Sequence, residues 1–485
     1  MVNPRRLFVC SCIALVTSAF TFSLSGAVMQ DLGTEFNFTQ TQNGGINQAR
    51  FWGMAASLAL GGFICDLLGM KRIMVLALLS HLVGTLGIVF SRNLLPEEVS
   101  TSGAYWWLYA FSIIMGCGNG FTEVGINPLA ATLYPKEKTH YLNILHAWWP
   151  GGLIIGGLLA IVVRNQLFAN TSEIFGLNLW QFSLLLIVVP AVVYGLMLLR
   201  AEFPHTERVE SGISTGDMMM QALRPMFLLW AACMLLTACT ELGPQQWQES
   251  VMQRTAGISG TGILVYTSGL MFVLRHFAGP IAHRLSPVGL LTVSAALSAV
   301  GLYLLSFADN AATAFGYATI FGLGIAYFWP TMLGVAAERF PKGGALVLAL
   351  MGTAGNAAIA FILPEMGRIV DHYTVQYVET KAPEFSGQLL QRDDSGRAIA
   401  LDARVVDRLS KEAPDSAEYS VARDAQKIGF SMAFRLIAIL PCVLVVVFGA
   451  IALYDKARGG YRPELLLSRA EEDELYGGGV QAAVE

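Results

Sequence analysis

The sequence has few charged residues. Asp, Glu, Lys and Arg make up only 14% of its 485 residues, whereas 54% of the residues are hydrophobic. A soluble chain of this length covers its surface with charge, so this composition excludes an ordinary soluble protein. The net charge of −4 is too small to indicate a nucleic-acid partner. The composition therefore indicates a protein embedded in the lipid bilayer.

Sequence motifs of enzymes are also missing. No glycine-rich Walker loop, nucleophile elbow or paired-histidine zinc motif occurs in the chain. We therefore expect no enzymatic activity, no ATP-driven step, no cofactor and no metal. All seven cysteines lie in or beside apolar segments, so we expect no structural disulfide.

Apolar runs of about twenty residues, the length of a membrane-crossing helix, recur along the whole chain. The first run follows basic residues, as in a cleaved signal peptide, but it continues to Met29 and is interpreted as a span. Lys and Arg gather in the tails and in the loops after even-numbered spans, which places both termini in the cytoplasm and the protein in the cytoplasmic (inner) membrane. The predicted spans are 7–30, 45–68, 73–91, 105–134, 140–163, 177–199, 223–247, 259–283, 287–307, 313–338, 344–367 and 428–454.

The two halves of the chain repeat. The motif Gly116, Gly118, Pro135, Lys136 around the fourth span recurs around the tenth span, at a constant offset of 206 residues, as Gly322, Gly324, Pro341 and Lys342. Pro128 and Pro330 lie inside these two spans, four residues out of step. The predicted fold class is an all-α polytopic membrane protein with 12 spans in two six-helix pseudo-symmetric halves and corresponding broken helices. The predicted domains are 1–199, a cytoplasmic linker 200–222, 223–454 and a cytoplasmic tail 455–485.

A polar stretch, 368–427, interrupts the second half on the outer side. Loops of this length are usually functional or disordered. We favour a solvated, flexible excursion, and the alternative is a small folded cap over the outer mouth.

Polar side chains inside a bilayer are costly, so each is a functional candidate. Glu123 lies eleven residues before Tyr134, about 16 Å from the helix end and near the bilayer centre. Asn119 and Asn127 lie four residues to either side, on the same face. We interpret Glu123 as a cavity-lining carboxylate that binds sugar hydroxyls or carries a proton. The alternative is a structural buried ion pair.

A second polar cluster lies on the seventh span. Glu241 and Gln245 share a helix face, and Trp247 follows. Carboxylate, amide and indole groups together suit a polyhydroxylated ligand. For the neighbours Gln246 and Gln248, a helix end wetted by solvent is the alternative.

The fifth and tenth spans add further candidates. Asn143, His146 and Trp149 recur every three residues on one face of the fifth span. His146 is a second candidate for coupling, because an unperturbed histidine has a pKa of about 6.5 and can carry a proton. The alternative is a neutral hydrogen-bonding role. Trp329 on the tenth span is interpreted as part of an aromatic wall, although packing alone explains such a residue.

Two arginines lie within spans. Arg50, near the outer end of the second span, is expected to extend to the interface, with an ion pair as the alternative. Arg275 lies eight residues before His283, about 12 Å into the membrane, and requires a partner. The available carboxylates are Glu241 and Glu123.

The turn after the second span predicts a gating latch. In Gly62-x-x-x-Asp66-x-x-Gly69-x-Lys71-Arg72, the carboxylate accepts from a neighbouring helix N-terminus while the cations face the interface. Such contacts must break when the two halves rock.

Twelve spans, the repeat and this turn together resemble the major facilitator superfamily over the full length. Within it, the segment from Gly118 through Glu123 to Asn127-Pro128 resembles the fourth-helix motif of the fucose:proton symporter family. The resemblance implies that Glu123 belongs to the binding cavity and the coupling machinery. Glu241 with Trp247 six residues later resembles the seventh-helix pattern of related sugar transporters, including the sodium-dependent glucose branch.

The sequence departs from that family at three positions. The family's first helix carries an aspartate that takes part in proton coupling, and ungapped alignment places Gly26 there. A glutamine and an asparagine of the family's fifth span are His146 and Trp149 here. The resemblance therefore does not imply an intact two-carboxylate mechanism.

The sequence favours a secondary transporter that moves a monosaccharide-like sugar together with a proton or sodium ion. An uncoupled sugar facilitator, an exporter of a hydrophobic or cationic compound, and a non-transporting membrane sensor are the alternatives. A sensor would lose its function on deletion of 368–427, whereas a transporter would tolerate the deletion.

Overall fold

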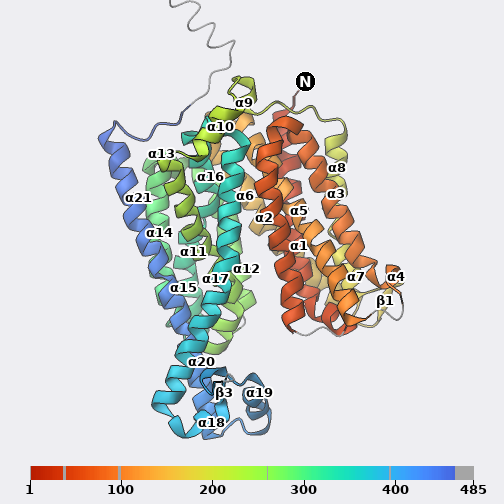
Figure 1. The fold of residues 1–485 in the computed structure, drawn as a ribbon, viewed down its shortest axis with the longest axis vertical. Coiled ribbons are helices and arrows are strands. Elements are labelled where there is room, and N and C mark those ends of the chain that lie inside the picture. Colours follow the sequence, from red (N-terminus) through yellow and green to blue (C-terminus); the bar gives the residue numbers. More distant parts are fainter. Residues whose placement is uncertain (1, 37–39, 97–99, 259, 393–394, 465–485) are drawn as a thin grey trace, which may run out of the picture.

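The computed structural model describes residues 2–36, 40–96, 100–258, 260–392 and 395–464, and it is almost entirely helical (Figure 1). The segment 465–485 of the predicted tail lies outside the described residues. Ten helical segments among the described residues are long and apolar enough to cross a membrane. The two other predicted spans, 105–134 and 259–283, are also helical; α5 carries the polar residues Asn119, Glu123 and Asn127, and α12 has only 17 residues.

The first six predicted spans form one bundle. Its elements are α1 (Pro4–Glu35), α2 (Gln40–Leu68), α3 (Met70–Val89), the short α4 (Ser91–Leu94), α5 (Thr101–Leu133), α6 (Lys138–Val162), the π-helical turn η1 (Val163–Leu167), the antiparallel hairpin β1 (Glu173–Ile174) and β2 (Leu177–Asn178), α7 (Leu179–Leu185) and α8 (Val188–Leu199).

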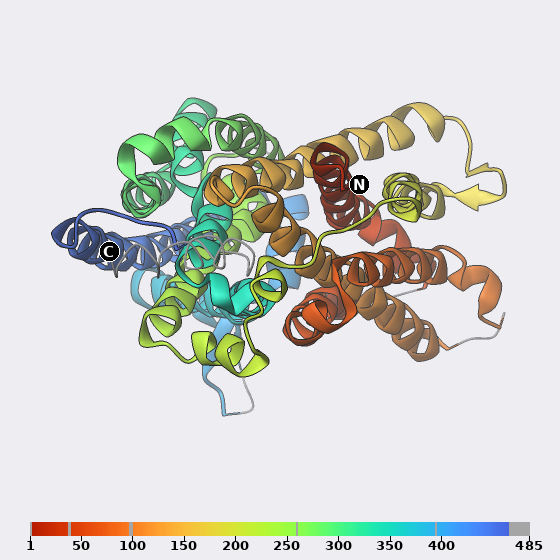
Figure 2. The same ribbon diagram turned by 90° about the horizontal axis from the view of Figure 1, so that it is seen from above.

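A linker with α9 (Glu207–Glu210) and α10 (Thr215–Ala222) leads to the second bundle. That bundle consists of α11 (Pro225–Thr255), α12 (Gly260–His276), α13 (Ala278–Leu285), α14 (Pro287–Leu305), α15 (Ala311–Ile325), α16 (Phe328–Arg339), the turn η2 (Pro341–Gly343), α17 (Gly344–Lys381), α20 (Ala417–Ile437) and α21 (Ile439–Ala457). Figure 2 shows the two bundles side by side, with the linker crossing between them.

Glycines allow the helices of each bundle to approach closely. A Cβ atom on Gly118 of α5 would lie 2.5 Å from the ring of His81 on α3. A Cβ atom on Gly324 of α15 would lie 2.4 Å from the backbone of Ser298 on α14. Small residues at such contacts are typical of membrane helix packing. These two glycines are the pair expected from the repeat, and they occupy equivalent helix contacts in the two halves.

The prolines of the repeat act differently. α5 continues through Pro128, whereas the tenth span divides into α15 and α16 at Ala326 and Tyr327. The expectation of corresponding broken helices is therefore wrong for α5. A proline frees the carbonyl four residues earlier, and in α5 the Cys65 thiol donates to that carbonyl of Val124 at 3.6 Å.

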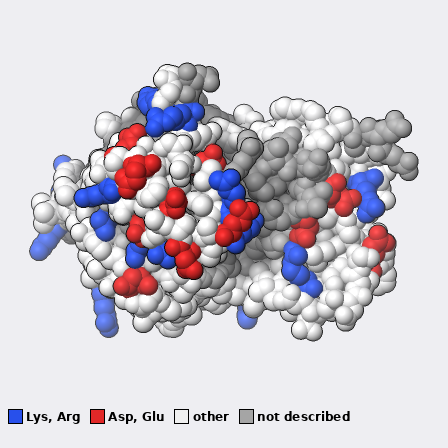
Figure 3. Space-filling view, turned by 90° about the horizontal axis from the view of Figure 1, so that it is seen from below, with Lys and Arg blue, Asp and Glu red and all other residues white. Residues whose placement is uncertain are grey.

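The described residues of the stretch 368–427 are folded, which contradicts the favoured flexible excursion. α17 extends beyond its predicted end to Lys381. After it come η3 (Pro383–Phe385), α18 (Ser386–Leu389), the antiparallel pair β3 (Leu390–Arg392) and β4 (Ala398–Leu401), and α19 (Ala403–Glu412). Buried Leu389, Val406 and Ala422 form a small core under these elements. This insertion subdomain rests on α17 and α20 of the second bundle, opposite the linker (Figure 1), and Figure 3 shows acidic and basic side chains interspersed on the face on that side of the protein.

Candidate functional site

A cavity of about 960 Å³ lies between the two bundles. Its walls come mainly from α1, α2, α5 and α6 of the first bundle and from α11, α12, α16 and α17 of the second. The lining residues lie between the middle of these helices and their ends on the insertion side. The cavity therefore extends toward the insertion side, and its floor lies at about the middle of the spans.

Most of the predicted solute-binding residues face this cavity. Asn127, Asn143 and Trp247 do not: Asn127 accepts a 2.9 Å hydrogen bond from His146, Asn143 lies between the bundles, and Trp247 packs against Phe430. Helix spacing placed these three on the correct helices but could not show which neighbour covers them. The predicted residues that line the cavity are Glu123, His146, Trp149, Glu241, Gln245 and Trp329.

Glu123 is a buried carboxyl group at the cavity wall. Its side chain is 5% exposed, and its Oε2 atom has no hydrogen-bond partner among the described residues. It forms no ion pair within the described part of the chain, which disfavours the structural ion pair considered from the sequence. Asn119, predicted on the same face, instead bonds Thr21 and His81 inside the first bundle. Glu123 thus keeps a free acceptor for a solute or a proton.

The carboxylate that pairs with Arg275 is Glu241. Arg275 Nη2 donates to Glu241 Oε1 at 3.2 Å, and both side chains are buried. Of the two partners left open by the sequence, the structure therefore selects the one on the adjacent helix α11. The second oxygen of Glu241 has no partner among the described residues and remains available at the cavity wall.

Arg275 also binds two carbonyl groups that prolines release. Its Nε donates to the Ala326 carbonyl at 2.6 Å, and its Nη1 donates to the His146 carbonyl at 2.8 Å. Pro330 and Pro150 each follow four residues later, where the missing N–H leaves these carbonyls unbonded. Unpaired carbonyls are costly in a membrane, and one guanidinium satisfies both. Because α6 belongs to the first bundle, Arg275 joins the two bundles at the cavity floor.

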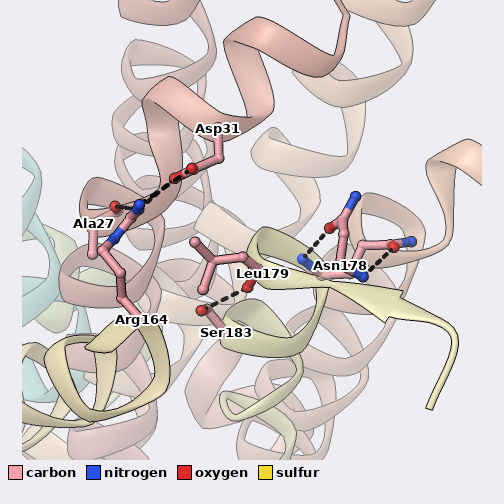
Figure 4. A network of polar contacts seen from close by, with 7 residues as sticks. Ala27, Asp31, Arg164, Asn178, Leu179 and Ser183 are labelled. Carbon is pink, nitrogen blue, oxygen red and sulfur yellow. Dashed lines mark hydrogen bonds and ion pairs between the residues drawn. The ribbon is translucent and has the colours of Figure 1, made fainter. Parts of the chain in front are cut away.

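Figure 4 shows a polar network among α1, η1 and α7, several of whose residues line the cavity. Arg164 pairs with Asp31 at 2.5 Å and donates to the Ala27 carbonyl at 3.2 Å. Ser183 donates to the Leu179 carbonyl at 2.8 Å beside it. Arg164 is half exposed and already neutralised, so this cluster holds α1 and η1 together at the rim.

On the linker side of the cavity the bundles meet along a seam formed by Thr139, Asn143, Thr331 and Glu338. Glu338 accepts from the Thr139 backbone N–H at 3.1 Å and from its hydroxyl at 2.7 Å. Asn143 donates to the Thr331 hydroxyl at 3.2 Å. The Glu338 carboxylate thus lies at the N-terminus of α6, where the helix dipole favours it. Glu338 was not among the residues predicted from the sequence. A carboxylate in the last turn of a helix interacts unfavourably with the helix dipole, and this could have indicated a partner outside the helix.

The chain after α21 returns to this seam. The Tyr461 hydroxyl donates to Glu338, and the Glu464 N–H donates to the Glu338 carbonyl at 2.8 Å. Burial, together with the neighbouring Glu338 carboxylate, raises the pKa of the Tyr461 phenol well above its usual range. The phenol therefore remains a hydrogen-bond donor at physiological pH.

The predicted latch binds the linker. Asp66 accepts from Thr206 at 2.6 Å and from the Arg208 guanidinium at 2.7 Å. Lys71 donates to the Ala201 carbonyl at 2.9 Å, and Arg72 is exposed. The sequence predicted a helix N-terminus as the hydrogen-bond partner of Asp66. The structure gives linker side chains instead, and Lys71 also binds the linker.

The glycines of the latch have separate roles. Gly69 has φ +83°, a conformation that side-chain-bearing residues rarely adopt. A Cβ atom on Gly62 would lie 2.5 Å from the Cβ of Ala349, so Gly62 allows α2 to contact α17 of the other bundle. The latch thus combines a tight turn with close packing between the bundles.

Comparison with known proteins explains this architecture. The model of the family described as Major Facilitator Superfamily matches residues 11–363. The chain belongs to the Major Facilitator Superfamily. It is therefore a membrane-spanning transporter rather than an enzyme, as the sequence indicated. Among curated proteins, it is 24% identical to the gentisate transporter of Corynebacterium glutamicum over 60% of this chain and 64% of that one. It is also 24% identical to the cis,cis-muconate transport protein of Acinetobacter baylyi, over 73% and 86% of the two chains.

Solved structures of superfamily members share the fold. The proton:xylose symporter XylE bound to 6-bromo-6-deoxy-D-glucose has a TM-score of 0.69 at 11% identity, over 92% of this chain and 95% of that one. The transporter FucP in its outward conformation has a TM-score of 0.63 at 15% identity, over 90% and 98%. These likenesses confirm the predicted fold.

Loss of Glu338 should weaken closure of this superfamily member on the linker side. Glu338→Ala removes two charge-assisted hydrogen bonds between the bundles, each worth about 1.5–3 kcal/mol, so the population open at the seam should rise at least about tenfold. Double electron–electron resonance measures this population from the distance between two spin labels. The labels are attached to cysteines introduced at the exposed positions Lys136 and Lys342, and the exposed Cys442 is replaced by serine. The exposed acid Glu365→Ala is the control, and unchanged distances in Glu338→Ala would contradict the role of the seam.

Proposed function

We propose that this chain is a secondary active transporter that moves a small polar organic solute, of monosaccharide size, by alternating access. The cavity carries the proposal: it lies at the middle of the spans, takes polar groups from both bundles, and ends at a bonded seam on one side only. In this proposal the linker and both termini lie in the cytoplasm of an inner-membrane protein, which the excess of Lys and Arg in the loops on that side supports. The described arrangement then faces outward, and the seam is the cytoplasmic gate.

A sugar is the first candidate solute. Glu123 and Gln245 offer acceptors and donors for hydroxyl groups, and Trp149 and Trp329 offer flat apolar faces for a ring. Glu123, with its unpartnered oxygen, is the proposed site of coupling to a proton or sodium ion, and His146 beside the floor is the second coupling candidate.

An organic acid is the second candidate solute. The gentisate and muconate named for the two curated relatives both carry carboxylate groups. In this chain the cationic Arg50 lines the cavity. The same cation disfavours export of a hydrophobic cation, which would meet a positive charge at the cavity wall.

Uptake by proteoliposomes tests the proposed function. Radiolabelled hexoses, gentisate and muconate are offered at fixed membrane potential, with and without an inward pH or sodium gradient. We expect one gradient to drive accumulation of at least one solute. Equilibration without accumulation would indicate an uncoupled facilitator, consistent with Gly26 at the cavity wall. Absence of flux for every solute would contradict the proposed transport function.

A further inference from the structure

Arg50 is a buried cation at the cavity wall without an acidic partner among the described residues. Its side chain is 2% exposed, so it does not extend to the membrane interface as expected from the sequence. Its guanidinium donates to the Thr21 carbonyl and to the Asn47 side-chain oxygen, and it lies 5.4 Å from the centre of the Phe22 ring. These partners are all neutral, and no ion pair involves Arg50 within the described ranges.

The other buried cations of the described chain are all paired. Arg275 pairs with Glu241, Lys138 with Glu207 at 2.6 Å, and Arg208 with Asp66 at 2.7 Å. Burying a charge without a counterion is costly, and such residues in a membrane mark solute or ion pathways. Arg50 is the exception among these four, and it is the one that lies on the insertion side of the cavity.

The first bundle holds Arg50 in a fixed place. Thr21, whose carbonyl accepts from Arg50, accepts a hydrogen bond from the Asn119 amide at 3.0 Å. The Asn119 oxygen accepts from His81 at 2.9 Å, and the Tyr194 hydroxyl lies 3.1 Å from the other ring nitrogen. An amide oxygen only accepts, so His81 donates through Nε2 and accepts from Tyr194 through Nδ1. This chain of neutral hydrogen bonds fixes α1 against α3, α5 and α8.

Glycine packing fixes the backbone of Arg50 itself. A Cβ atom on Gly116 of α5 would lie 2.2 Å from the Arg50 carbonyl oxygen, and one on Gly53 would lie 2.1 Å from the carbonyl oxygen of Ile113. Only glycine permits α2 and α5 to approach so closely at these two positions. The guanidinium is thus preorganised before any solute arrives, which lowers the entropic cost of binding.

Two groups, one cationic donor and one carboxyl acceptor, therefore face one cavity with hydrogen-bonding capacity left unused. Arg50 has N–H donors left over, because a guanidinium carries five of them. Glu123 has an oxygen left over, and no ion pair joins it to Arg50. A solute that complements both presents a carboxylate to Arg50 and a hydroxyl donor to Glu123.

We propose that Arg50 binds the carboxylate of the transported solute, and that this solute is a small hydroxylated carboxylic acid whose hydroxyl group donates to Glu123. The proposal rests on the proposed transport function and names the substrate class of the same cavity. The planar guanidinium matches a carboxylate with two parallel hydrogen bonds, which a lysine cannot reproduce. The aromatic walls at Trp149 and Trp329 accommodate either a sugar ring or a benzene ring between these ends.

Matched probes isolate the carboxylate. Gentisate and hydroquinone differ only by that group, and D-galacturonate and D-galactose differ only at one carbon. Isothermal titration calorimetry on the purified full chain measures the affinity for each probe. We expect at least one acid to bind wild-type protein more than about tenfold tighter than its neutral counterpart, because a charge-assisted pair contributes at least this much.

Variants then assign the preference to Arg50. Arg50→Gln should lower the ratio of the two affinities, acid over neutral probe, to about one, and Arg50→Lys should retain part of the preference. Arg254→Gln, which removes an exposed arginine on the same side of the protein, should leave the preference unchanged.

Three results would overturn the assignment: equal binding of acid and neutral probe by wild-type protein, binding of neither acid, or an unchanged preference in Arg50→Gln. The wild-type comparison decides even if Arg50→Gln fails to fold. A neutral hexose could instead be taken up under a gradient, equally by wild-type protein and Arg50→Gln. That result would support the transport function and contradict a carboxylic acid as the substrate. Absence of all flux would instead contradict the transport function itself.

Discussion

Replacing Arg275 with leucine should abolish transport and destabilise the protein by about 3–5 kcal/mol. The change leaves the Glu241 carboxylate buried without its cation, and it orphans the carbonyls of Ala326 and His146. It also removes the bond that joins α12 to α6 across the cavity floor. Thermal unfolding in detergent measures the stability, and proteoliposome uptake of the identified solute measures transport.

A second variant separates the two losses. Arg275→Met with Glu241→Met removes the unpaired Glu241 charge and should recover part of the stability, while the carbonyls of Ala326 and His146 stay unbonded. Transport should stay absent, since the link between the bundles and the polar cavity wall are not restored. The exposed Arg254→Leu is the matched control. Wild-type uptake by Arg275→Leu would show that the link is dispensable.

Glu123→Gln should abolish accumulation while leaving exchange intact. A glutamine keeps the size and a side-chain oxygen of Glu123 but cannot bind and release a proton. With one proton per solute, a gradient of one pH unit supports about tenfold accumulation, and this ratio should fall to about one in the variant. Proteoliposome accumulation and counterflow, measured on the same preparation, report the two activities.

The surface variant Glu365→Gln controls for the removal of a carboxylate, because Glu365 is exposed and, among the described residues, pairs only with Arg368 three positions on. It should accumulate solute normally. Normal accumulation by Glu123→Gln would end the coupling role of Glu123 and direct attention to His146. If the coupling ion is sodium, the same loss should appear under a sodium gradient.

Much of this site was predictable because single helices repeat regularly. Helix periodicity placed Glu123 near the membrane centre and grouped it with Asn127 on one face. The cost of a buried cation required a partner for Arg275 and limited the choice to two acids. His81 carried the same signal as Glu123, a titratable residue within an apolar span, and could have been found by applying the rule to every span.

The remaining features depend on neighbours distant in sequence. The spacing of Asn143 and Asn127 is as regular as that of Glu123, yet Thr331 and His146 cover them. Trp247 follows Glu241 closely but turns to the second bundle. Which face of a helix meets a cavity depends on the rotation of that helix in the bundle, and no local pattern specifies this rotation.

The sequence by itself determined the membrane class, the helical spans, the repeat of the two halves and the buried carboxylate Glu123. These follow from hydropathy, periodicity and the cost of burying charge, which are local properties of the chain. Only the tertiary structure decided that Arg275 takes the carbonyls freed by Pro150 and Pro330, that the described part of 368–427 folds, and that Arg50 has no acidic partner within the described chain. The physical reason is that each of these depends on the distance between side chains of different helices, which packing sets and sequence spacing does not.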